Sequence, residues 1–266
     1  MQPLNAVSTI RNAAAVLRLL SPERLELSVT EVARLLNMPK SSVSRLLKAM
    51  MEEGLLAPIG NSPRYRAGNL LIEVASLHGR NSTLMEAAET ALADICKTTR
   101  HSGYISVLDG IDILVLRVFR GAEPLRVVTP LGSRAPAYAT STGRALLARL
   151  TDDEIRRLYS SPGDFRVHAE NAPQSIDELL TRLARVRRTG WCEAIDEAVP
   201  DVGSVSVAVN DPLTETLALC VSFPAHLVSK TDRLEIADML TRTARQIQAG
   251  DREHEAVERR QRAIAR

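Results

Sequence analysis

The strongest constraint on the fold comes from two short helical segments between residues 28 and 52, separated by a tight turn. Thr30 is a suitable N-cap for the first helix, and Asn37 ends it because asparagine tolerates the left-handed backbone of such a turn. Ser41 or Ser42 opens the second helix, with Pro39 before it or in its first turn. Apolar residues recur at helical spacing on one face of each helix: Val32, Leu35 and Leu36, then Val43, Leu46, Leu47 and Met50.

The other face of the second helix is basic and rich in hydroxyl groups. It carries Lys40, Ser41, Ser42, Ser44, Arg45 and Lys48. Together with the small residue Ala33, which allows the helices to cross closely, this pattern predicts a helix-turn-helix. Hydroxyls and first-turn N–H groups suit phosphates, and Arg45 and Lys48 have the reach for base edges or the DNA backbone.

Two strand-like runs follow at 55–59 and 64–67, and they predict a wing that brings Arg64 and Arg66 close to DNA. Residues 1–80 hold 10 Lys and Arg against 6 Asp and Glu, net +4, whereas the rest of the chain holds 24 against 26, net −2. The alternative is a small helical core with ordinary solvated charges. The wing and the basic excess coincide with the helices, so we favour DNA binding.

The chain has 266 residues, which exceeds the usual size of one domain, and its 45% hydrophobic content is typical of a globular protein. We predict a winged helix-turn-helix domain over residues 1–67, a linker helix within 68–80 and a second domain over 81–266. A helix from about Ser8 to Leu20 completes the first core. The linker helix, at 70–77, has an apolar surface that suits a partner subunit or packing under the neighbouring domain.

The second domain mixes helical and strand patterns. Helices are expected at 83–97 and 141–149. Two further helices are expected to begin at the capping boxes of Thr151 and Ser175, and a last one to run from Ser229 or Thr231 to Gln248. Strands are expected at 102–108 and 113–120, joined by an Asp109-Gly110 turn, and at 125–129, 204–209 and 217–222. This order predicts an α+β domain with an antiparallel sheet.

Other classes of function find little support. The three cysteines, at positions 96, 192 and 220, lack Cys-x-x-Cys spacing, so we expect no metal site and no cofactor. No Gly-x-Ser-x-Gly, P-loop or His-Glu-x-x-His motif occurs, and Cys220 as a nucleophile has no identifiable base, so we do not expect an enzyme. His101 remains a weak polar candidate for a pocket. No signal peptide or 18-residue apolar run is present, which predicts a cytoplasmic protein without a membrane partner.

In combination, several segments resemble the IclR family of transcriptional regulators. They are Tyr65–Gly68, the 130–136 loop with the 139–148 helix, Gly190-Trp191, Glu197, and residues 204–209 and 220–224. The resemblance spans about residues 7–248. It implies a winged helix-turn-helix, a linker helix and a GAF/PAS-like effector domain, in dimers that pair through the DNA-binding half and often assemble into tetramers.

The resemblance also implies a small-molecule pocket on the concave side of the sheet. Carried over by position, its residues are Ser141, Thr142, Ser204, Cys220 and Ser222, with an acidic position near 194–196. Because Ser141 and Thr142 begin a helix, they suit a carboxylate; the alternative is that these small residues only pack the sheet against a helix. Ala194 occupies the position that corresponds to the acidic pocket residue, so Asp196, two positions later, is the candidate that replaces it. We therefore expect a carboxylate-bearing metabolite, a class that includes aromatic acids, rather than a small keto acid.

The expected mechanism is a dimer that places two recognition helices on an inverted-repeat operator, with effector binding transmitted through the linker helix. The competing interpretation keeps the DNA-binding half but gives the second domain only an oligomerising role.

Overall fold

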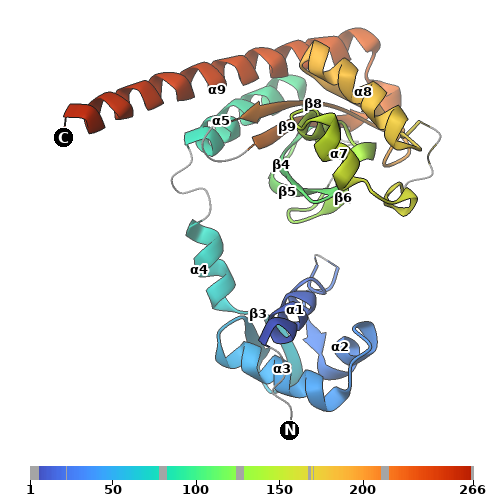
Figure 1. Ribbon diagram of the computed structural model, residues 1–266, viewed down its shortest axis with the longest axis vertical. Helices are drawn as coiled ribbons and strands as arrows, with labels where there is room; N and C mark the ends of the chain where they lie inside the picture. Colours follow the sequence, from blue (N-terminus) through green and yellow to red (C-terminus); the bar gives the residue numbers. More distant parts are fainter. Residues whose placement is uncertain are drawn as a thin grey trace. The chain divides into compact units, whose positions relative to one another are not determined.

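The structure, a computed structural model, describes residues 6–21, 23–77, 83–123, 129–166, 169, 171–210 and 216–264. The chain divides into two compact units, Met1–Asn81 and Ser82–Arg266 (Figure 1). Each unit has its own hydrophobic core.

The first unit is a winged helix-turn-helix, as the sequence predicts. Its elements are α1 (Ala6–Leu17), β1 (Leu27–Ser28), α2 (Val29–Leu35), α3 (Lys40–Glu52), β2 (Leu56–Ile59), β3 (Ser62–Ala67) and α4 (Asn69–Leu77). The three strands form a small sheet in the order β1-β3-β2. Val16, Val32, Val43, Leu47 and Met50 bring the apolar faces of α1, α2 and α3 into one core.

The turn chemistry explains where these helices begin and end. Asn37 has a positive φ of 50°, as expected for the turn, and Pro39 is the N-cap of α3. The N-cap of α2 is Ser28 rather than Thr30, because Ser28 and Glu31 form a reciprocal capping box. The wing turn is also tighter than predicted, since Ile59 already pairs with Ser62.

The second unit is an α+β domain. It contains α5 (Thr83–Thr99), β4 (Ser102–Asp109), β5 (Asp112–Phe119), β6 (Arg134–Pro136), the 3-10 turn η1 (Ala137–Ala139), α6 (Ser141–Leu147), α7 (Asp152–Leu158), α8 (Ile176–Thr189), β7 (Cys192–Ile195), β8 (Val202–Asn210), β9 (Thr216–Pro224) and α9 (Lys230–Ile264). The strands form one antiparallel sheet in the order β6-β5-β4-β9-β8-β7.

Helices cover both faces of this sheet. On one face, α5 and α9 pack on strand residues such as Ile105, Val205 and Leu219. On the other face, α6, α7 and α8 form a second cluster with η1, through residues such as Tyr138, Leu146, Ile155 and Leu179. Strand residues alternate between these two environments, which fixes the side chains that face α6.

Most of the predicted elements of the second unit are confirmed, including the capping box at Thr151. Ser175 is the N-cap of α8 as predicted, but the box there is incomplete, because Glu178 accepts a hydrogen bond from Gln174 N instead of from Ser175 N. The short strands β6 and β7 were not predicted, and α9 continues well beyond Gln248. The predicted domain boundary at 80–81 and most of the predicted strand at 125–129 lie outside the described residues. So does the Asp211-Pro212 turn that the sequence indicates between the strands at 204–209 and 217–222. None of the described helices is long and apolar enough to cross a membrane.

Candidate functional site

The second helix of the helix-turn-helix presents one polar face to solvent. Lys40, Ser41, Ser44, Arg45 and Lys48 are exposed and Ser42 is half-buried, while Val43, Leu47 and Met50 are buried on the opposite side. Arg45 Nε donates to the Ser41 carbonyl oxygen at 3.4 Å, and Lys48 lies 3.9 Å from Glu52. Both contacts are local and solvent-exposed, so both cations remain available to another molecule.

The two wing arginines differ in their surroundings. Arg66 is exposed, but Arg64 is half-buried and pairs with Glu26 at 2.9 Å and Glu31 at 3.2 Å. Glu31 is also the capping-box residue of α2, so Arg64 ties β3 to the start of that helix. The structure therefore gives Arg64 a role inside the first unit that the sequence did not indicate.

In the second unit, a cavity of about 110 Å³ lies between the sheet and the start of α6. Hydroxyl, thiol and apolar groups from all six strands of the sheet share its lining, which includes Tyr104, Ser106, Ile113, Val115, Ala135, Thr140, Thr142, Ala194, Ser204, Cys220 and Ser222. Arg134 and Glu197 are the charged residues of the described lining. Such a mixture suits a small, partly polar molecule.

Of the six residues predicted for this pocket, Thr142, Ser204, Cys220 and Ser222 line the cavity, and Ser141 and Asp196 do not. Ser141 is fully buried, and its Oγ lies 2.7 Å from both Ser204 Oγ and Ser206 Oγ, which fixes α6 to β8. Asp196 Oδ1 instead accepts a hydrogen bond from the Asp201 backbone N–H, which closes the turn between β7 and β8.

The start of α6 is held very close to η1. Thr140 is the N-cap, and its Oγ1 accepts a hydrogen bond from Gly143 N at 3.0 Å. A Cβ on Gly143 would lie 2.1 Å from the Ala137 carbonyl oxygen, so only glycine fits there. This close approach sets the position of Thr142 at the cavity.

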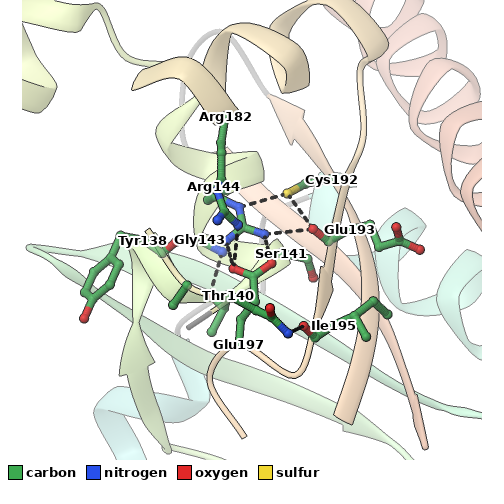
Figure 2. A network of polar contacts seen from close by, with 12 residues as sticks. Tyr138, Thr140, Ser141, Gly143, Arg144, Arg182, Cys192, Glu193, Ile195 and Glu197 are labelled. Carbon is green, nitrogen blue, oxygen red and sulfur yellow. Dashed lines mark hydrogen bonds and ion pairs between the residues drawn. The ribbon is translucent and has the colours of Figure 1, made fainter. Parts of the chain in front are cut away.

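Arg144 anchors the same helix through a buried polar network (Figure 2). Its guanidinium binds both carboxylate oxygens of Glu197, and it donates to the Tyr138 carbonyl oxygen at 3.0 Å and the Glu193 carbonyl oxygen at 2.8 Å. Only 2% of Arg144 and 6% of Glu197 is exposed. Burial disfavours the charged guanidinium, but Cys192 and Glu197 favour it more strongly, so the pKa of Arg144 is raised and the group stays charged.

Sequence reasoning did not assign a role to Arg144, although one signal was present. An arginine among Ala145, Leu146 and Leu147 on a short apolar helix indicates a charge that needs a buried partner. Glu197 supplies that partner.

Ser106 is a second residue that the sequence did not single out. It lies on β4 opposite Ala218 and Val115, is fully buried, and lines the cavity. Its Oγ has no hydrogen-bond partner among the residues that the structure describes. An unpaired buried hydroxyl is costly, so this group is suited to a ligand hydrogen bond.

The histidine and cysteine candidates do not form a second reactive or metal-binding site among the described residues. His101 lies 5.7 Å from the Phe223 ring and outside the cavity lining, and burial lowers its pKa. Burial raises the pKa of Cys96 to about 12 and also raises the pKa of Cys192, so neither thiol is activated. Within the described ranges, no three His, Cys, Asp or Glu side chains gather as metal ligands.

Comparison with known proteins agrees with this architecture. Residues 76–249 match the family model of the bacterial transcriptional regulator IclR C-terminal domain, and residues 9–59 match that of the IclR helix-turn-helix domain. The HTH-type transcriptional regulator KdgR of Escherichia coli is 28% identical over 246 residues, which cover 92% of this chain and 93% of KdgR.

Two solved structures share the fold. An IclR transcriptional regulator from Silicibacter sp. superimposes with a TM-score of 0.80 at 21% identity, covering 91% of this chain and 96% of the other. An IclR homolog from Microbacterium hydrocarbonoxydans, complexed with 4-hydroxybenzoate, gives a TM-score of 0.77 at 20% identity, covering 92% and 99%. The matched families and relatives are transcriptional regulators and not enzymes. The chain belongs to the IclR family of DNA-binding transcriptional regulators.

Proposed function

We propose that this regulator binds an inverted-repeat operator through α3 and the wing, and that a small organic acid in the effector cavity changes its affinity for that operator. The observation that carries the proposal is the exposed basic, hydroxyl-rich face of α3 in a chain of this family. Operator DNA lies in the bacterial cytoplasm, so the proposal assigns the protein to that compartment.

On DNA, we propose that Arg45 and Lys48 face the major groove. The α3 serines and Lys40 would hold phosphates, Arg66 would meet the flanking backbone, and Arg64 would position the wing. Two copies of α3 are needed for an inverted repeat. The exposed apolar side chains of α4, Leu70, Ile72 and Val74, supply a surface on which two or four copies of the chain could associate.

Replacing Arg45 with alanine tests the role of α3. If Arg45 reads a base, specific affinity should fall by about 1–3 kcal/mol and specificity should relax at one operator position. If it contacts phosphate, all sequences should weaken together and the salt dependence should fall. Fluorescence anisotropy with labelled operator and random DNA separates these results. Arg11→Ala is the matched control, because Arg11 is exposed and belongs to α1, which is not among the elements proposed to contact DNA. Equal affinities of the two variants would remove Arg45 from the interface.

For the effector, the cavity size and lining are the evidence. The cavity volume of about 110 Å³ favours a compact organic molecule as the ligand. Thr142, Ser204 and Ser222 provide hydroxyls, and Arg134 provides a cation. The related IclR homolog complexed with 4-hydroxybenzoate supports a small organic acid as the ligand class.

The Ser106→Ala variant tests this assignment with two opposite effects. Removing an unpaired buried hydroxyl should leave the melting temperature of the ligand-free protein unchanged or higher. The same change should weaken ligand binding by roughly 0.5–1.5 kcal/mol, because one hydrogen bond is lost. Calorimetry with 4-hydroxybenzoate and a panel of other small organic acids measures the affinity. Ser160→Ala, an exposed serine outside the cavity lining, is the control.

Two results would count against the effector proposal. If no acid of the panel binds, the second unit has only the oligomerising role. If an acid binds and Ser106→Ala retains its full affinity, the ligand lies elsewhere.

A further inference from the structure

We propose that the cleft between α8 and the free edge of β7 is a second ligand site, which takes an anion attached to a flat apolar group. The cleft has a volume of about 490 Å³, within the range of small-molecule sites. Glu197 lines both this cleft and the effector cavity, and its buried partner Arg144 also lines the cleft. The inference is independent of what the effector cavity binds.

The edge of β7 supplies hydrogen-bond donors to the cleft. β7 is the last strand of the sheet, and Asp196 N donates to the Val202 carbonyl oxygen at 3.0 Å. Along an antiparallel strand, the backbone N–H and C=O groups of successive residues point alternately toward the neighbouring strand and away from it. In this register, Glu193 and Ile195 direct their backbone N–H and C=O groups away from β8.

The outward carbonyl groups of this edge are already used. Thr189 Oγ1 donates to the Trp191 carbonyl oxygen at 2.9 Å, and Arg144 donates to that of Glu193 at 2.8 Å. Asn171 Nδ2 donates to the Ile195 carbonyl oxygen at 3.4 Å. An added peptide strand would therefore find its acceptors occupied, whereas the N–H groups of the edge remain directed toward the cleft.

The side chains of the cleft also leave an excess of donors. Arg182 and Arg185 lie three residues apart on α8, so they are neighbours on one helix face. Arg182 reaches Glu197 at 3.3 Å, but no carboxylate of the described residues lies within ion-pair distance of Arg185. The Glu193 carboxylate is paired with Arg233 at 2.7 Å. The free groups are thus cationic, and they suit a carboxylate or a phosphate.

Trp191 gives the cleft its apolar part. It is partly buried against the core of the second unit and lines the cleft beside Val186. An indole face offers a flat surface for stacking, so an anion carried by an aromatic ring engages the arginines and the indole together. Trp191 is also the single tryptophan of the chain, so tryptophan fluorescence reports changes at this cleft.

The experiment is a titration of tryptophan fluorescence in the full chain with benzoate, phenyl phosphate and inorganic phosphate, and with benzyl alcohol as the neutral comparison. We expect a saturable change with at least one of the aromatic anions and none with benzyl alcohol. Arg185→Gln should weaken binding roughly tenfold or more, because a charge-assisted hydrogen bond is lost. Arg188→Gln, an exposed arginine of the same helix outside the cleft lining, should bind like the parent protein.

Three outcomes would overturn the proposal. One is the absence of any saturable change with either aromatic anion. Another is an equal affinity of Arg185→Gln and Arg188→Gln. The third is a response that Ser106→Ala weakens and Arg185→Gln does not, which would assign the aromatic anion to the effector cavity. If inorganic phosphate binds as tightly as phenyl phosphate, the stacking role of Trp191 is wrong.

Discussion

Replacing Arg144 with methionine is expected to lower the free energy of unfolding of the second unit by about 3–5 kcal/mol, because the change leaves a buried carboxylate without its main partner. Of its ion pairs with the described residues, Glu197 would retain only the one with Arg182 at 3.3 Å. The carbonyl oxygens of Tyr138 and Glu193 would lose donors as well. Thermal or urea unfolding of the purified protein measures the loss.

The matched control is Arg156→Met. Arg156 pairs with Asp177 at 3.1 Å, but both side chains are more than half exposed, so we expect a loss of at most about 1 kcal/mol. A double variant, Arg144→Met with Glu197→Leu, should recover part of the stability by removing the stranded charge. If Arg144→Met is no worse than Arg156→Met, the buried pair does not hold α6 in place.

The second large effect is expected at Leu47. This side chain is fully buried in the small core of the first unit, and truncation to alanine should cost about 2–5 kcal/mol. Small domains have little stability in reserve, so this loss should unfold much of the first unit and abolish DNA binding. Because the second unit has its own core, ligand binding there should persist.

Circular dichroism, DNA anisotropy and ligand calorimetry on the same preparation test this separation. Leu35→Ala is the control, since Leu35 lies on α2 and is 37% exposed. We expect it to cost less than about 1 kcal/mol and to leave DNA binding nearly intact. Loss of ligand binding in Leu47→Ala, together with DNA binding, would show that the two units do not fold independently.

The first unit was largely predictable from the sequence because its signals are local. Apolar residues at helical spacing, the Asn37 turn and the basic face of α3 all lie within about twenty-five residues of sequence. The exact N-cap was misassigned, since two hydroxyl residues compete there and only Ser28 is placed to complete the box with Glu31. The role of Arg64 depended on partners that only the folded wing brings together.

The cavity was harder to predict because its residues come from distant strands. Hairpin signals located β4 and β5, but the four-residue strand β7 shows little periodicity and exists because β8 pairs with it. The family resemblance placed several hydroxyl residues in the pocket, and only some of them line it. Ser141 does not line the cavity, because its hydroxyl bonds to Ser204 and holds α6 against β8. Ser106 was not predicted, although it lines the cavity from the largely apolar strand β4. Burial of a polar group in this way is a tertiary property.

The central claim is that an organic acid changes the affinity of this protein for a specific operator. The most direct measurement is a gel-shift of the full chain against the DNA upstream of its own gene and its neighbours, at near-physiological salt, with and without the acid panel. The account predicts a specific complex whose affinity one acid alters, and an alteration that Ser106→Ala weakens. A specific complex that no acid alters would contradict the effector half. No complex with any upstream fragment, together with an empty genome-wide selection for bound DNA, would contradict the claim itself.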